Sequence, residues 1–159
     1  MPFAKIDNAI NVCKSHLDSI DKNDPYLIEI ETYIVSALIL LIISEYEELI
    51  ENIFAERANL CRDNHVSNYV RTTISQKFKS PDLGKITEIL GKFGSDYRKS
   101  LSDNILNTEA HFAWDNIMKA RHAIVHKKGI LNITFRELTA TYPKTKLVID
   151  ELKNTLGVV

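Results

Sequence analysis

The chain has 159 residues, the length of one domain, and it can bury a core without disulfides or a structural metal. Its 20 lysines and arginines nearly balance 21 aspartates and glutamates, which excludes a general attraction to nucleic acid or membranes, so any basic site must be local. Cys13 and Cys61 lie far apart and outside metal-ligand spacing, so we expect two small apolar fillers in a reducing compartment.

The first ten residues lack a basic start followed by an apolar core, so no secretion signal is expected. The strongest apolar run is IVSALILLII, residues 34–43, with glutamates on both sides. It is too short to span a bilayer, which needs about 20 residues. We therefore expect a cytoplasmic protein without membrane contact. In such a protein, the apolar run 34–43 would be buried on most sides, in a bundle centre or at a subunit interface.

The dominant periodicity of the N-terminal half is helical. Apolar residues three and four apart predict a first helix over 6–20, which the turn-forming segment DKNDP, 21–25, ends. A second helix over about 25–60 would be roughly 50 Å long and must pack along others for most of its length. A third helix is expected over 66–79.

Five more segments follow in the C-terminal half. Ser80 is expected to cap a fourth helix, PDLGKITEILGKF, which ends at Gly94. The next segment, SDYRKSLSDNIL, predicts only a helical turn and a loop. A fifth helix, NTEAHFAWDNIMKARHAIVHKK, would begin at a Thr108 cap and close at Gly129.

Thr134 and Glu137 form a capping-box pattern at the start of a short helix. After Tyr142-Pro143 a last helix extends to about Leu156. The whole pattern predicts an all-α, single-domain helical bundle over residues 1–159, with about five to seven helices and one long central helix.

Basic side chains gather in KARHAIVHKKG, residues 119–129, at the expected end of the fifth helix. His122 and His126 are four residues apart and share a face, whereas Arg121 lies about 140° from His126 on an ideal helix. Spacing alone therefore does not describe a complete site in one chain. A structural interpretation is that basic residues favour the last turn of a helix, whose free carbonyls attract them. A metal half-site at the histidine pair would need further ligands, and the neighbouring sequence offers none at ligand spacing.

The chain resembles the HEPN superfamily of small helical domains, many of which are ribonucleases, and within it the bacterial RiboL-PSP-HEPN branch. The family motif is an arginine, a polar residue, a few more residues and a histidine near the end of a late helix. RHAIVH, 121–126, matches this motif, with His122 where the family more often has Asn or Asp. ILGKFGSDYRKSL and the apolar run leading into EYEELIENIF extend the resemblance over roughly residues 30–130.

The resemblance implies a metal-independent endoribonuclease that needs no cofactor. Histidine suits acid and base work because it titrates near neutrality, and arginine binds phosphate through its planar, permanently charged fork. His126 would act as acid or base, and Arg121 would bind the scissile phosphate and stabilise the transition state. His122 would orient His126 or carry the second proton.

Other residues would support this site. Glu47, after the apolar run, is the first candidate for the acidic residue that often accompanies the motif in such proteins, and Glu45 is the second. Lys119, Lys127 and Lys128 would bind RNA.

HEPN domains commonly pair, so a homodimer that joins two motifs in one cleft is expected. RNA would be the substrate, and an antitoxin or regulatory protein of a toxin–antitoxin or phage-defence system is a further expected partner. One alternative is a non-catalytic HEPN dimer that acts as a protein-interaction or nucleotide-binding module. Another is an unrelated helical bundle without enzymatic function.

Overall fold

A computed structural model describes residues 2–78, 80–126 and 131–158, which contain seven α-helices and no strand. The helices are α1 (Ala4–Ser19), α2 (Leu27–Asn59), α3 (Asn64–Lys77), α4 (Leu83–Phe93), α5 (Ser95–Ile105), α6 (Glu109–His126) and α7 (Phe135–Leu156). The predicted all-α bundle with one long helix is confirmed for the described residues.

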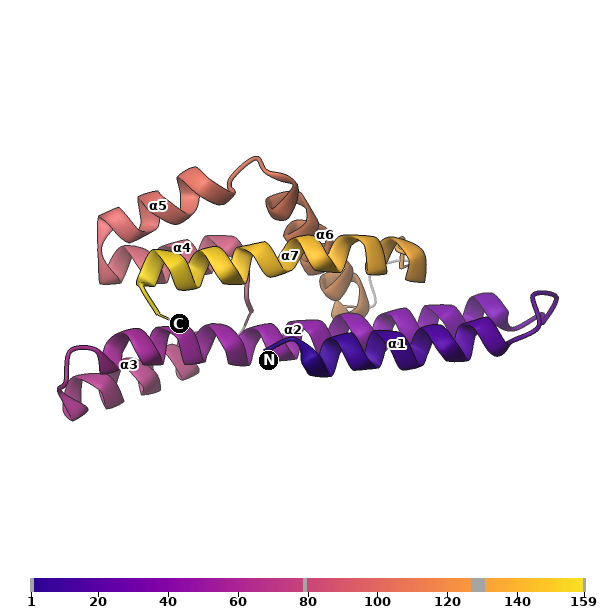
Figure 1. Ribbon diagram of the computed structural model, residues 1–159, viewed down its shortest axis with the longest axis horizontal. Helices are drawn as coiled ribbons and strands as arrows, with labels where there is room; N and C mark the ends of the chain where they lie inside the picture. The colour runs from indigo at the N-terminus through magenta and orange to yellow at the C-terminus, as the bar shows by residue number, and fades with distance from the viewer. Residues whose placement is uncertain (1, 79, 127–130, 159) are drawn as a thin grey trace.

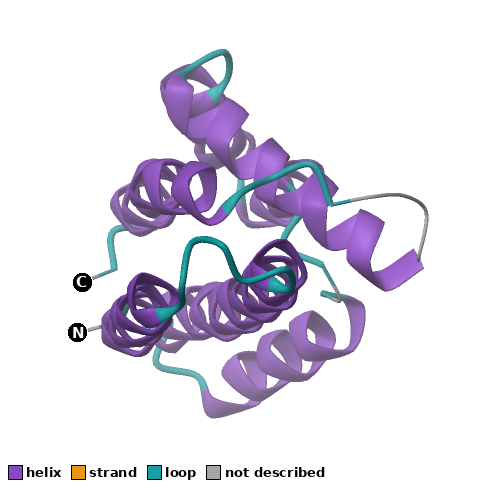
Figure 2. Ribbon diagram, turned by 90° about the vertical axis from the view of Figure 1, so that its right-hand side faces the viewer, coloured by secondary structure: helices purple, strands orange, loops and turns teal. Residues whose placement is uncertain are grey.

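The helices form two layers (Figure 1). In one, α2 runs the length of the molecule, with α1 beside its N-terminal half and α3 beside its C-terminal end. In the other, α4 and α5 lie at one end and α7 runs along α2. The remaining helix, α6, crosses steeply, and its C-terminal end comes down beside α2 (Figures 1 and 2). This crossing brings the end of α6, which carries the histidines, to the middle of the long helix.

An aromatic pair joins the layers in the core. The rings of Tyr46 in α2 and Trp114 in α6 stack with centroids 5.0 Å apart and planes 5° apart, and both side chains are fully buried. The Thr145 hydroxyl in α7 donates to the Tyr142 carbonyl at 2.6 Å. Its proton is therefore committed, so the Tyr46 hydroxyl donates to Thr145, also at 2.6 Å. The contact fixes α2, α6 and α7 against one another without an unpaired hydroxyl at Tyr46.

The apolar run of α2 is buried on its inner side only. Five of its residues are buried: Val35, Leu38, Ile39, Ile42 and Ile43. Leu40 stays 42% exposed, and 28% of the most apolar 18-residue window of α2 is buried. By length and composition alone α2 is long and apolar enough to cross a membrane, a test that core helices also pass. Here it packs against α1, α3, α6 and α7.

Two expected loops are helical because packing overrides local propensity. SDYRKSLSDNI is the full helix α5, held by Leu101 and Ile105, which are buried one turn apart. Pro143 lies inside the continuous helix α7, where two helices were predicted. A proline there costs one backbone hydrogen bond, and the buried residues Tyr142, Val148 and others on both sides of it keep the helix intact.

The predicted caps have mixed outcomes. Thr134 and Glu137 form the predicted capping box, with Glu137 N–H donating to the Thr134 hydroxyl at 3.2 Å. The Thr108 hydroxyl accepts from the His111 N–H at 3.3 Å, as a cap does. The prediction that Ser80 caps α4 is wrong, because Asp82 takes the N-cap position and Ser80 is buried two residues earlier.

Two further expectations concern Cys61 and Gly129. The Cys61 thiol is exposed, so it is not the buried filler that was predicted. The predicted closing role of Gly129 lies outside the described residues.

Candidate active site at the end of α6

The last turns of α6 carry a stacked histidine pair. The imidazole rings of His122 and His126 have centroids 5.9 Å apart and planes 11° apart, and both residues are exposed. Their predicted shared face is therefore confirmed. Two imidazoles held in one orientation at the surface are accessible to a substrate from solvent.

A carboxylate of α4 faces this pair. Oδ1 of Asp82 lies 3.9 Å from Nε2 of His122, and its Oδ2 lies 3.8 Å from Nζ of Lys85. Sequence reasoning missed both residues, because it placed the helix cap at Ser80 and no motif singles out Asp82 or Lys85. The buried Trp114 anchors their loop by donating its indole N–H to the Pro81 carbonyl at 2.8 Å. The core of α6 thus fixes the position of the carboxylate beside its own histidines.

Arg121 lies on the side of α6 that faces α2, where it is half-buried near Glu47. Burial raises the pKa of the Glu47 carboxyl above its ordinary value, and the charge of Glu51 adds to this. The cations of Arg121 and Lys85 act in the opposite direction and lower that pKa. Glu47, Arg121 and Lys85 therefore form one electrostatic cluster.

The second acidic candidate, Glu45, lies elsewhere. It forms an ion pair with Lys5 of α1. Residues two positions apart in the sequence are about 200° apart around a helix. Because Glu47 is on the side of α2 toward α6, Glu45 is on the side toward α1. Glu47 thus lies within electrostatic range of Arg121, whereas Glu45 is held by Lys5 of α1.

The cluster has two parts that one chain does not join. Arg121 pairs with the α2 side, whereas His122 and His126 face the α4 side and solvent, as the helical angle predicted. Lys85 is related to both parts: it lies 3.8 Å from Asp82 on the α4 side, and its charge lowers the pKa of Glu47 on the α2 side. Within residues 2–78, 80–126 and 131–158, no three His, Cys, Asp or Glu side chains come together as a metal site.

The predicted RNA-binding lysines are only partly described. Lys119 is exposed on α6. It stands seven residues before His126, which places it on nearly the same face, about 10 Å along the axis. Lys127 and Lys128 lie outside the described residues.

A heptad-spaced stripe on α2 leads to this site. Tyr26, Tyr33, Leu40 and Glu47 are seven residues apart and so lie along one face. Tyr26, Tyr33 and Leu40 are 65%, 68% and 42% exposed.

The family model of RiboL-PSP-HEPN matches residues 3–157. The chain belongs to this family. The match extends beyond the expected 30–130, so the HEPN domain includes both α1 and α7. HEPN domains are frequently ribonucleases or nucleotide-related proteins. No curated protein and no solved structure matches the chain.

Proposed function

We propose that this HEPN domain is a metal-independent endoribonuclease. One observation carries the proposal: the end of α6 bears Arg121, His122 and His126, and the chain belongs to a family whose members are frequently ribonucleases. Arginine and imidazole are the groups that RNA cleavage needs when no metal supplies the charge.

In the proposed reaction the ribose 2′-oxygen attacks the adjacent phosphorus as its proton passes to an imidazole. The bond from phosphorus to the 5′-oxygen breaks, and that oxygen takes a proton from a second acid. The products are a 2′,3′-cyclic phosphate and a 5′-hydroxyl. His126 serves as acid or base, and His122 orients it or carries the other proton.

Arg121 holds the scissile phosphate and the charge that builds up on it in the transition state. Glu47 supports the site by holding the guanidinium of Arg121 in place from α2. Lys119, Lys127 and Lys128 attract the RNA backbone to this end of α6.

A homodimer would complete the site. One chain carries Arg121 and His126 on different sides of α6, so groups from a second copy are needed to surround one phosphate. The apolar stripe of Tyr26, Tyr33 and Leu40 supports this arrangement, because it is exposed and ends at Glu47. Two copies related by a two-fold axis would bury both stripes and bring both motifs to one cleft.

We place this enzyme in the cytoplasm, where an unrestrained ribonuclease harms its own cell. An antitoxin or other regulatory protein is therefore part of the proposal. The electrostatic attraction between Glu47 and Arg121 also suits a second function, a non-catalytic HEPN dimer for protein or nucleotide binding, in which that attraction is structural.

The experiment is incubation of the purified protein with total RNA in EDTA, with analysis of the product ends. We expect cleavage to persist and to leave 2′,3′-cyclic phosphate and 5′-hydroxyl ends. Arg121→Ala and His126→Ala should abolish it, and His122→Ala should reduce it less. The exposed residues His65 and Arg136 provide matched controls, and His65→Ala and Arg136→Ala should cleave as the wild type does.

Loss of cleavage on chelation, or 5′-phosphate ends, contradicts the mechanism. Unchanged cleavage by Arg121→Ala or His126→Ala contradicts the site. A folded dimer that cleaves no RNA supports the non-catalytic module instead.

A further inference from the structure

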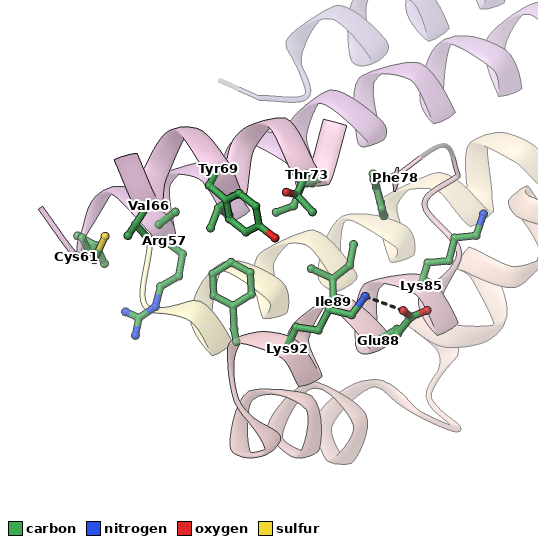
Figure 3. Close-up of a pocket in the computed structure, with 15 residues that line it drawn as sticks. Arg57, Cys61, Val66, Tyr69, Thr73, Phe78, Lys85, Glu88, Ile89 and Lys92 are labelled. Carbon is green, nitrogen blue, oxygen red and sulfur yellow. Dashed lines mark hydrogen bonds and ion pairs between the residues drawn. The ribbon is translucent and has the colours of Figure 1, made fainter. Parts of the chain in front are cut away.

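A large groove lies between the C-terminal end of α2, α3 and α4 (Figure 3). Its volume is about 870 Å³, in the range of ligand-binding sites. Val70, Ile74, Ile89 and Phe93 contribute to its apolar floor. The groove exists because α3 packs on α2 and leaves its side toward α4 open.

The rim of the groove is cationic. Arg57, Lys85 and Lys92 line it together with one carboxylate, Glu88. The whole chain carries a net charge of −1, so this positive balance is local. Lys92 is 2.9 Å from Glu88 in an exposed i,i+4 pair, a weak interaction that leaves the ammonium able to meet an anion.

An exposed aromatic side chain stands at the mouth. Tyr69 is 72% exposed, and it reaches from α3 toward the edge of α4 that bears Ile89 and Lys92 (Figure 3). The fold gains little from a ring in this position. A flat ring beside lysines is the arrangement on which single-stranded nucleic acids stack their bases.

The groove begins at the candidate active site. Lys85 lines one end of the groove and lies 3.8 Å from Asp82, and its charge lowers the pKa of the Glu47 carboxyl. From there α4 carries Lys92 about 10 Å farther along the groove. A strand whose phosphate is held at Arg121 can therefore continue past Lys85 into the groove.

We propose that this groove binds unpaired bases of single-stranded RNA next to the cleaved linkage, with Tyr69 as the stacking platform and Lys85 and Lys92 as phosphate contacts. The inference rests on the proposed ribonuclease function and adds a substrate class to it. An acidic amphipathic helix would also suit the apolar floor. RNA is favoured because Lys85, which lines the groove, also lies 3.8 Å from Asp82 of the candidate active site.

The first test measures binding without cleavage. A fluorescent single-stranded RNA of about a dozen nucleotides, 2′-O-methylated at every ribose, is titrated with protein and followed by anisotropy. Tyr69→Leu should weaken binding about tenfold because it removes a stacking face, whereas Tyr69→Phe should bind as the wild type does. An acidic peptide helix would accept leucine at this position.

The second variant tests the cationic rim with a matched control. Lys92→Glu should weaken binding several-fold and reduce its salt dependence. Lys99→Glu breaks an equivalent exposed i,i+4 pair with Asp103, 2.7 Å long, on α5 and should have no effect. Equal effects of the two variants would show only a general charge response and would overturn the inference.

The third test separates this inference from the proposed function. The rate ratio of a long RNA to a dinucleotide should fall about tenfold in Tyr69→Leu and stay unchanged in Tyr69→Phe. If the wild type cleaves RNA and Tyr69→Leu binds and cleaves the long RNA equally well, the groove inference is wrong and the nuclease stands. If binding depends on Tyr69 but nothing is cleaved, the groove stands and the nuclease falls. Binding of an acidic helical peptide that is unchanged in Tyr69→Leu, without binding of the RNA, would assign the groove to a protein partner and overturn the inference.

Discussion

Replacing Trp114 by phenylalanine should weaken both the core and the candidate site. Phenylalanine can keep the stack on Tyr46 but has no N–H for the Pro81 carbonyl, which is buried in the wild type. That carbonyl loses its donor, and the smaller ring leaves a void in a fully buried position. The loop that carries Asp82 then loses its anchor.

The size of the effect follows from these two losses. A buried acceptor left without a partner costs about 1–3 kcal/mol, and the void adds to this, for about 2–4 kcal/mol in all. For a chain of 159 residues, each kcal/mol moves the melting temperature by about 2–4 °C. We therefore expect Trp114→Phe to melt about 4–16 °C below the wild type.

Thermal unfolding by circular dichroism measures the first part, and cleavage well below both melting points measures the second. Leu152→Ala provides the control, because it truncates a fully buried residue of α7 at a similar cost of about 2–5 kcal/mol. Trp114→Phe should lose activity that Leu152→Ala keeps. A melting temperature within about 2 °C of the wild type, or equal activity in both variants, would refute the anchoring role of the indole.

Two further predictions concern α2. Burial raises the pKa of Glu47, so the folded state favours the protonated carboxyl. The protonated carboxyl contributes stability to the fold that is fully present below the unfolded pKa near 4.5 and is lost as pH rises through the folded pKa. Glu47→Gln should therefore melt above the wild type at neutral pH, by a margin that shrinks toward pH 4.5, while cleavage falls; a lower melting temperature at neutral pH would contradict this. Leu40→Glu should convert the proposed homodimer to the 18.2 kDa monomer in light scattering and abolish cleavage, whereas Leu147→Glu, on exposed α7 surface, should stay dimeric. A wild-type monomer would contradict the proposed dimer, and a dimeric Leu40→Glu would place its interface elsewhere.

Periodicity and turn chemistry were sufficient to predict most helices, including the long α2 and the Thr134 capping box. They failed at Pro143 and at SDYRKSLSDNI, where a helix forms because buried side chains such as Leu101 and Val148 pack on other elements. Local propensity carries no information about such contacts. Helical spacing predicted the shared face of His122 and His126 and the separation of Arg121 from them.

The rest of the candidate site depends on tertiary packing. The resemblance offered both Glu47 and Glu45 as the acidic residue, and only the packing of α1 and α6 on α2 decides which of them faces Arg121. Asp82 and Lys85 come about 40 residues before the motif, at a helix start that has an ordinary sequence. No local pattern connects them to the histidines.

The contact between Tyr46 and Thr145 joins residues 99 positions apart, and it bears on the order of events during synthesis. When α2 leaves the ribosome, Phe3 is the one aromatic ring contact of Tyr46, among the described residues, that has already been made. Trp114 arrives with α6, and the hydroxyl that pairs with Tyr46 arrives only with α7. A nascent chain therefore carries Glu47 long before Arg121 and the two histidines of α6 are made. Whatever chemistry the site performs, translation of α7 must be nearly finished before it begins.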